Sequence, residues 1–235
     1  MNCLTDYHAR LLPMMGEHIA SPADSLLAMD LLHEKYGIKR FCLIAEYDYR
    51  EESVAMLRLR MERSLESMAS LLQKREFRVE TAGCALVLPE VSRMEGLHRL
   101  RLPKTDYLPI RFSLARDADA RLLELNRLLY HFPLKLLFLS FDQLAATLDQ
   151  DALDRLLSLP SVAYQFSYRS LTDPRIRDIL RLLLRKRAPI LFGSEITSPG
   201  EAAYYELDSY LECARREFSC FEYETLLFQK KIFQS

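Results

Sequence analysis

The stretch Asp6-Tyr7-His8-Ala9-Arg10-Leu11-Leu12-Pro13 sets the expectations for the fold of this chain. A short apolar segment ends here, and a carboxylate, an imidazole and a guanidinium follow within five residues. The chain has five histidines, and none lies after position 131. Chemistry placed in the last part of the chain must therefore use side chains other than imidazole.

Composition limits the classes of function. With 49% hydrophobic residues, a chain of 235 residues can bury a substantial core, either as one large α/β domain or as two small ones. Lys and Arg (32) nearly balance Asp and Glu (33), so the charge gives no reason to expect a nucleic-acid partner. The five cysteines include no Cys-x-x-Cys pair, which argues against a zinc site and favours buried reduced thiols.

The first residues and the hydropathy of the chain predict in which compartment the protein lies. The first residues show no basic region followed by an apolar one, so no secretory signal is expected. No uninterrupted apolar run reaches roughly 18 residues, so no membrane span is expected either. We therefore expect a soluble, cytoplasmic protein.

Strand and helix patterns alternate along the whole chain. After the first short strand, strands are expected at 38–45, 77–88, 108–114, 134–139, 162–166 and 189–192. Helices are expected from Ser21 to Gly37, at 51–75, from Asp119, at 143–158, from Asp173, and from Ser198 to about Phe218. Residues 89–107 look like an irregular, polar surface excursion. This rhythm favours a parallel sheet, and six to eight units without a flexible linker favour a closed or distorted α/β barrel.

The opening stretch resembles the Asp-x-His-x-His-x-x-Pro signature of PHP-type metal-dependent phosphoesterases, with Arg10 at the second His. The order of later features is similar to the bacterial PHP-type tyrosine phosphatases that accompany capsule and exopolysaccharide synthesis. These features are Leu12-Pro13, the helix opened at Ser21, the strand at 40–45, Gln165-Phe166-Ser167 and Gly193-Ser194-Glu195. The resemblance implies a single distorted (β/α)7 barrel over residues 1–235, with two or three metal ions at the carboxyl ends of the strands.

The chain departs from that family at most expected ligand positions, and only Asp6 and His8 remain unchanged. In this chain Arg10 stands where the family has its second His, Gly16-Glu17 where it has an acidic pair, and Thr197 where it has its closing His. Three longer family motifs are also replaced: Thr-Pro-His by Glu46-Tyr47-Asp48, Gly-x-Glu by Gly83-Cys84-Ala85, and His-Pro-Glu-Arg by Ser140-Phe141-Asp142-Gln143. Arginine stays protonated and has no lone pair for a metal. The sequence therefore predicts a phosphoesterase scaffold whose metal site is largely lost.

Three interpretations of the remaining residues stay open. In the first, the Arg10 guanidinium replaces a metal charge at the barrel mouth, where it neutralises carboxylates or binds an anion; those carboxylates are Asp6, Glu17, Glu46 and Glu195. In the second, an oxygen-rich site for one Mg²⁺ or Mn²⁺ ion survives; its ligands are Asp6, His8, Glu17, Asp48 and Glu195. In the third, the resemblance is accidental.

The leading functional hypothesis is a catalytically impaired relative of the polysaccharide-associated tyrosine phosphatases that acts by binding and needs no cofactor. The alternative is an active metal-dependent phosphoesterase, in which Mn²⁺ or Mg²⁺ supplies hydroxide and Asp6 and Arg10 serve catalysis. The expected partner is a protein, either a bacterial tyrosine kinase or a polysaccharide-synthesis component, and a homo-oligomer is possible. The aromatic tail at 218–235 packs across the barrel bottom or joins a subunit interface, and Ser194 takes a loop or helix-cap role.

Overall fold

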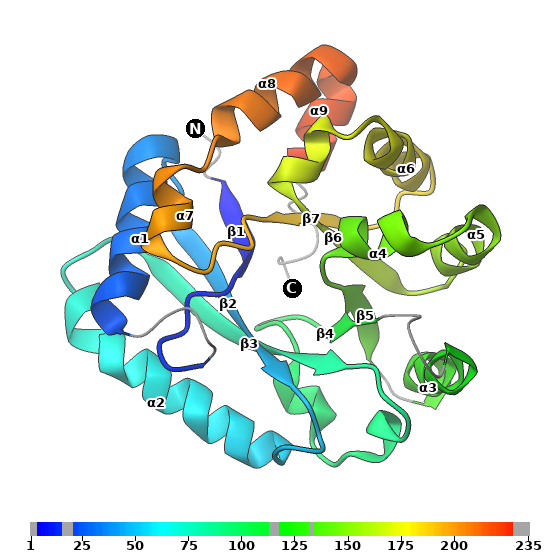
Figure 1. Ribbon diagram of the computed structural model, residues 1–235, viewed down its shortest axis with the longest axis horizontal. Coiled ribbons are helices and arrows are strands. Elements are labelled where there is room, and N and C mark those ends of the chain that lie inside the picture. Colours follow the sequence, from blue (N-terminus) through cyan, green and yellow to red (C-terminus); the bar gives the residue numbers. More distant parts are fainter. Residues whose placement is uncertain (1–3, 16–20, 113–117, 132–133, 228–235) are drawn as a thin grey trace.

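Seven parallel strands in sequential order form a nearly closed barrel with helices on its outside (Figure 1). The computed structural model describes residues 4–15, 21–112, 118–131 and 134–227. The strands are β1 (Thr5–Ala9), β2 (Arg40–Tyr47), β3 (Arg78–Leu86), β4 (Tyr107–Arg111), β5 (Lys135–Phe138), β6 (Val162–Ser167) and β7 (Ile190–Gly193). The predicted seven-unit α/β barrel is confirmed.

Helices follow the strands and begin where the sequence offers caps. They are α1 (Pro22–Tyr36), α2 (Val54–Leu72), α3 (Ala118–His131), α4 (Phe141–Thr147), α5 (Gln150–Leu157), α6 (Pro174–Arg185), α7 (Pro199–Ala203), α8 (Leu207–Glu217) and α9 (Cys220–Leu227). Ser21 caps α1 by accepting from the Asp24 backbone N–H, and Gly37 ends that helix with a φ of 68°. Ser198 caps α7 in the same way.

Three elements differ from the sequence expectations. The helix expected at 143–158 is two helices, because Asp149 leaves the helical conformation and caps α5. The helix expected from Ser198 to Phe218 is likewise divided into α7 and α8. The excursion at 89–107 carries two 3₁₀ turns, Val91–Arg93 and Leu97–Leu100, and is not purely polar, since its apolar side chains are buried against the barrel.

Two groups of buried apolar side chains fill the space on either side of the strands. The larger group joins the helices to the sheet. The smaller group consists of side chains that alternate with it along the strands, and so faces the barrel interior; it includes Cys42, Ile44, Ala82, Cys84, Leu137, Leu139, Ala163 and Leu191. Burial raises the pKa of the Cys42 and Cys84 thiols, as expected for inert core cysteines. Cys213 is half-buried and Cys220 exposed.

The barrel closes where the last strand meets the first. The Glu195 backbone N–H donates to the His8 carbonyl (2.8 Å), and the Arg10 N–H donates to the Ile196 carbonyl (3.0 Å). A Cβ atom on Gly193 would lie 2.7 Å from the His8 nitrogen and 2.9 Å from its Cα. Glycine is therefore required for this approach, which brings Glu195 beside His8.

The described part of the aromatic tail packs on the barrel. Helix α9 contacts α6 and β7, with Leu226 buried and Phe221 exposed. Phe218 is also buried, and the Arg181 guanidinium lies over its ring. Residues 228–235 of the predicted tail lie outside the described residues. No helix in the described ranges has the length and apolar character needed to cross a membrane.

Candidate functional site

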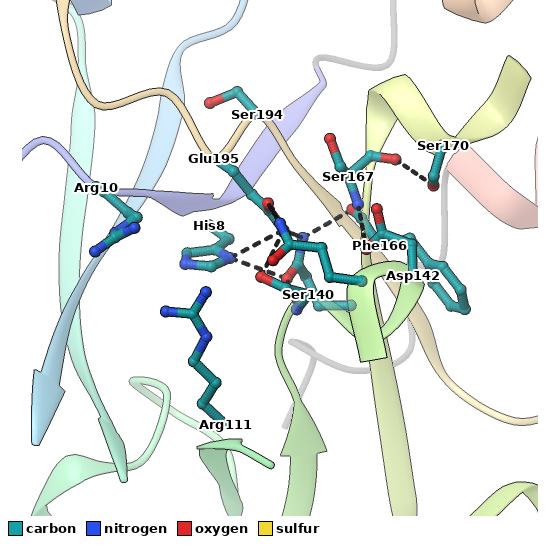
Figure 2. Close-up of polar contacts among 12 residues, drawn as sticks. His8, Arg10, Arg111, Ser140, Asp142, Phe166, Ser167, Ser170, Ser194 and Glu195 are labelled. Atoms are coloured by element: carbon teal, nitrogen blue, oxygen red, sulfur yellow. Dashed lines mark hydrogen bonds and ion pairs between the residues drawn. The ribbon is translucent and has the colours of Figure 1, made fainter. Parts of the chain in front are cut away.

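A cavity of about 290 Å³ lies at the carboxyl ends of the strands. We call it the mouth pocket. Its charged and amide-bearing lining residues are His8, Arg10, Arg111, Asp142, Gln143, Arg169, Glu195 and Glu201, and three serines, Ser140, Ser167 and Ser194, complete the lining. Most of these side chains come from the ends of β1 and β4, from the start of α4 and from the loop after β7 (Figure 2). The carboxyl end is where parallel α/β barrels place their active sites.

Glu195 is the most heavily hydrogen-bonded carboxylate of the mouth pocket. Its oxygens accept from the Ser140 hydroxyl (2.8 Å) and the Gln143 amide (2.9 Å), and one of them lies 3.5 Å from His8 Nδ1. Burial alone would raise the pKa of Glu195, but His8, Ser140 and Gln165 together lower it. Glu195 and Ser140 both have left-handed backbone conformations, with φ values of 58° and 50°. Strain of this kind concentrates at functional sites.

Gln165 supports the pocket from the barrel interior. This residue of β6 is fully buried, and its Oε1 lies 3.0 Å from His8 Nδ1. The same oxygen accepts from the Ser140 backbone N–H (2.8 Å). Gln165 thus connects the tips of three strands and fixes the orientation of the His8 ring.

Asp6 acts as an anchor for the loop after β7. Its carboxylate is fully buried and accepts from the Ser194 N–H (2.9 Å), the Ser194 hydroxyl (2.5 Å) and the His8 N–H (3.1 Å). Burial raises its pKa. The contacts of Ser194 fit the loop role expected for it, because its hydroxyl donates to Asp6 and accepts from the Ile196 N–H.

Arg10, Glu46 and Arg111 form a charged cluster beside the mouth pocket. The Arg10 guanidinium lies 3.7 Å from a Glu46 oxygen, and Arg111 donates to that same oxygen. Of the carboxylates expected around Arg10, the structure therefore brings Glu46 to it, whereas Asp6 and Glu195 have the partners described above. Two guanidinium groups share one carboxylate, and each of the three side chains is 38% exposed.

Of the remaining predicted ligands, Asp48 is the one that the structure describes. Asp48 pairs with Arg50 two residues along the chain, and this contact lowers the Asp48 pKa. Glu17 falls outside the described residues. The structure thus brings His8, Arg10 and Glu195 to one pocket, while the side chains of Asp6 and Asp48 are engaged with other partners.

Asp142 and Arg111 are pocket residues that the sequence did not single out. Asp142 accepts weakly from the Ser167 N–H (3.4 Å), and burial, helped by Glu195, raises its pKa to about 6. Arg111 ends β4, three residues before the strand end that the apolar pattern indicated. A shorter estimate of that strand would have placed Arg111 at the barrel mouth.

The described donors of the predicted metal site have contacts within the protein. Among the residues that the structure describes, no three His, Cys, Asp or Glu side chains converge in a way that could hold a metal ion. Asp6 accepts hydrogen bonds from Ser194, and Glu46 lies between two guanidinium groups. The Nδ1 atom of His8 faces Gln165. Asp6 and Glu46 would have to give up their present partners to ligate a metal, whereas the Nε2 atom of His8 would not.

Comparison with solved structures identifies the architecture. A chain from crystal structures of YwqE from Bacillus subtilis and CpsB from Streptococcus pneumoniae, described as unique metal-dependent tyrosine phosphatases, matches with a TM-score of 0.66. This barrel has the fold of those phosphatases. The match covers 99% of this chain and 97% of the other at 17% sequence identity. The resemblance expected from the opening stretch is thereby confirmed for the fold.

Comparisons of the sequence give no match for this chain. No protein-family model matches the chain, and no curated protein matches it significantly. The similarity is therefore carried by the three-dimensional arrangement, and the residues of the mouth pocket must be interpreted by their own chemistry.

Proposed function

We propose that this barrel recognises a phosphorylated ligand at the mouth pocket, as a catalytically impaired relative of the polysaccharide-associated tyrosine phosphatases that acts by binding. The observation that carries the proposal is the convergence of Arg10 and Arg111 on one carboxylate. This cluster holds two positive charges against one negative charge at the edge of the pocket. A phosphate group compensates such an excess.

The geometry of the guanidinium group suits phosphate. Its planar array of N–H donors matches two phosphate oxygens at once, and Arg10 and Arg111 are exposed enough to meet a ligand. Glu195 repels an anion less than its charge suggests, because Ser140, Gln143 and Gln165 all donate to it. The cavity is near the lower end of the range of small-ligand pockets, about 300 Å³.

The partner that we propose is a tyrosine-phosphorylated protein, such as a bacterial tyrosine kinase or a component of polysaccharide synthesis, encountered in the cytoplasm. A pocket of this volume can take up a phosphotyrosine side chain while the rest of the partner stays outside. The number of ligand molecules bound per chain shows whether a second copy of the chain takes part in binding.

The alternative is a metal-dependent phosphoesterase that uses Mn²⁺ or Mg²⁺. Its support is the shared fold with proteins described as metal-dependent tyrosine phosphatases. It requires Asp6, Glu195 and Asp48 to leave their present partners, with His8 and Glu17 completing the set. The two proposals differ in whether ligand binding needs the metal.

Calorimetry with phenylphosphonate, which resembles an aryl phosphate but resists hydrolysis, separates the two proposals. We expect binding in EDTA, and at least a tenfold weaker Kd in Arg111→Met and in Arg10→Met, equivalent to about 1.4 kcal/mol each. Arg50→Met is the matched control, because Arg50 pairs with Asp48 outside the pocket. Binding only after addition of Mn²⁺ would favour the enzyme, and no binding in either condition would reject the proposal.

A further inference from the structure

The orientation of the Gln165 amide is fixed by its neighbours. Its Oε1 accepts from the Ser140 backbone N–H (2.8 Å), which can only donate. Its Nε2 donates to the Phe166 carbonyl (2.8 Å) and toward Glu195 (3.4 Å), which can only accept. If the amide were reversed, its NH₂ group would face the Ser140 N–H and its oxygen would face the Phe166 carbonyl and Glu195. The oxygen of Gln165 must therefore be the atom that faces His8.

This orientation fixes the tautomer of the neutral His8 ring. Because the Gln165 oxygen lies 3.0 Å from Nδ1 and accepts, Nδ1 carries the proton. The lone pair is then on Nε2. Figure 2 shows the ring between Glu195 on one side and the guanidinium groups of Arg10 and Arg111 on the other. His8 lines the mouth pocket with these same residues, and because Nδ1 is held by Gln165, Nε2 is the ring nitrogen left for a ligand there.

We propose that His8 Nε2 accepts the phosphoryl group of a phosphate monoester held by Arg10 and Arg111. This inference rests on the proposed function, which places a phosphorylated ligand in the mouth pocket, and adds a metal-independent reaction to it. The substrate class is an aryl phosphate, whose phenolate is a good leaving group. Gln165 is a positioning residue, since it acts only through the His8 ring.

The reaction balances with substrate and water alone. The Nε2 lone pair attacks phosphorus, so an N–P bond forms while the bond between phosphorus and the aryl oxygen breaks. The phenolate leaves with that electron pair and takes a proton from solvent. The phosphorylated ring keeps its Nδ1 proton and a positive charge, which Glu195 stabilises from 3.5 Å. Water then attacks phosphorus, the N–P electron pair returns to Nε2, the attacking water loses its proton to solvent, and phosphate is released.

The other nucleophiles near the barrel centre are less suited to this role. The Ser140 hydroxyl donates to Glu195, whose lowered pKa makes it a weak base, and the buried Ser194 hydroxyl is held between Asp6 and the Ile196 N–H. Cys42 and Cys84 lie in the interior cluster with raised thiol pKa values. His8 combines access to the pocket with an available lone pair.

A trapping experiment tests the proposal. The full chain is incubated in EDTA with 4-nitrophenyl phosphate, quenched rapidly in alkali, which preserves phosphohistidine, and digested for mass spectrometry. We expect one adduct per chain on His8, absent from His8→Asn and present in His98→Asn, whose histidine is exposed and outside the pocket. An adduct on another residue, or one that forms only with Mn²⁺, would overturn the proposal.

Further outcomes separate this inference from the proposed function. Binding of phenylphosphonate in EDTA without any adduct would leave the binding proposal standing and reject phosphoryl transfer. Release of 4-nitrophenolate that depends on His8 but leaves no trapped adduct would also reject the covalent step. If the wild type does not bind phenylphosphonate, both the binding proposal and the phosphoryl-transfer proposal are rejected.

The tautomer is measurable without any reaction. Long-range ¹⁵N–¹H correlation spectra of the wild type should show neutral His8 with the proton on Nδ1 and a bare Nε2. Gln165→Leu, which removes the acceptor, should give a mixture of tautomers and at least tenfold slower adduct formation. A proton on Nε2 in the wild type would contradict the hydrogen-bond assignment.

Discussion

Asp142 and Glu195 share one cavity, yet their surroundings move their pKa values in opposite directions. Glu195 accepts hydrogen bonds from three side chains and lies beside His8, and these contacts outweigh its burial. Asp142 is partly buried, faces Glu195 and has only weak donors, so its pKa rises to about 6. Carboxyls with divergent pKa values are typical of sites that handle charged ligands.

The raised pKa of Asp142 predicts a pH-dependent cost to stability. The folded state keeps a proton that the unfolded state releases between pH 3.8 and about 6, so stability falls as pH rises through this window. Asp142→Asn removes the titration and keeps an oxygen for the Ser167 N–H. Urea unfolding at pH 4 and pH 7.5 measures the free energy of unfolding of both proteins. Relative to the wild type, the free energy of unfolding of the variant should rise between the two pH values, by about 3 kcal/mol at most.

The exposed Asp154 on α5 provides the control for this prediction, as Asp154→Asn. If the difference between Asp142→Asn and the wild type stays constant across the pH range, Asp142 does not titrate as the structure indicates.

Individual side chains were predictable where a local pattern decided their place. The family resemblance of the opening stretch implied that His8 would lie at the barrel mouth, and Glu46 was one of the four carboxylates expected around Arg10. The role of Gln165 was not predictable, because its contact with His8 joins residues 157 positions apart and depends on the backbone of Ser140. Asp6 was assigned to the site by the resemblance, whereas the Ser194 backbone N–H and the Ser194 hydroxyl donate to its two oxygens.

At the scale of elements, the position of the loop after β7 depends on Gly193 having no side chain. Gly193 lies against the backbone of His8, and an added methyl group would meet main-chain atoms that cannot rotate away. The hydrogen bonds that close the barrel follow directly, at Glu195 and Ile196. Close packing here positions the pocket as well as stabilising the fold.

Gly193→Ala should therefore destabilise the protein by about 1–3 kcal/mol through overpacking, measured as a lower urea midpoint. It should also weaken phenylphosphonate binding, because the His8 ring shifts with its backbone. Gly200→Ala is the matched control, since a Cβ there meets nothing closer than 3.8 Å and alanine favours helix α7. Equal stability of the two variants would contradict the role given to Gly193.

Capping residues made helix starts predictable, while breaks within helical patterns were not. Ser21 and Ser198 were each followed by proline and an acidic residue, and both cap helices. Asp149 interrupts a continuous helical pattern between α4 and α5, because its carboxylate accepts from the Ala152 N–H. Residues with capping chemistry are also tolerated inside helices, so composition alone did not reveal this break.

At the scale of the whole molecule, the alternation of strands and helices was sufficient to predict a barrel. The sequential strand order β1 to β7 is the simplest arrangement of such units. The closing contacts were not visible in the pattern, since they involve loop backbone rather than a regular ladder between β1 and β7.

The continuous sheet predicts that the chain unfolds as one unit. Urea titrations followed by far-ultraviolet circular dichroism and by the near-ultraviolet signal of tyrosine should coincide in midpoint and slope. The single domain over residues 1–235 proposed from the sequence requires this result. Two separate transitions would show that the first and second halves of the barrel are stable independently.

The closure at His8 and Gly193 has a consequence for the order of synthesis. Asp6 and Ser194 are hydrogen-bonded partners 188 residues apart, so a chain still being translated has its first site residues long before their supports. The mouth pocket cannot exist until the seventh strand has left the ribosome. Binding of the proposed ligand therefore requires a chain that extends past the seventh strand, and shorter nascent or truncated forms should not bind at this site.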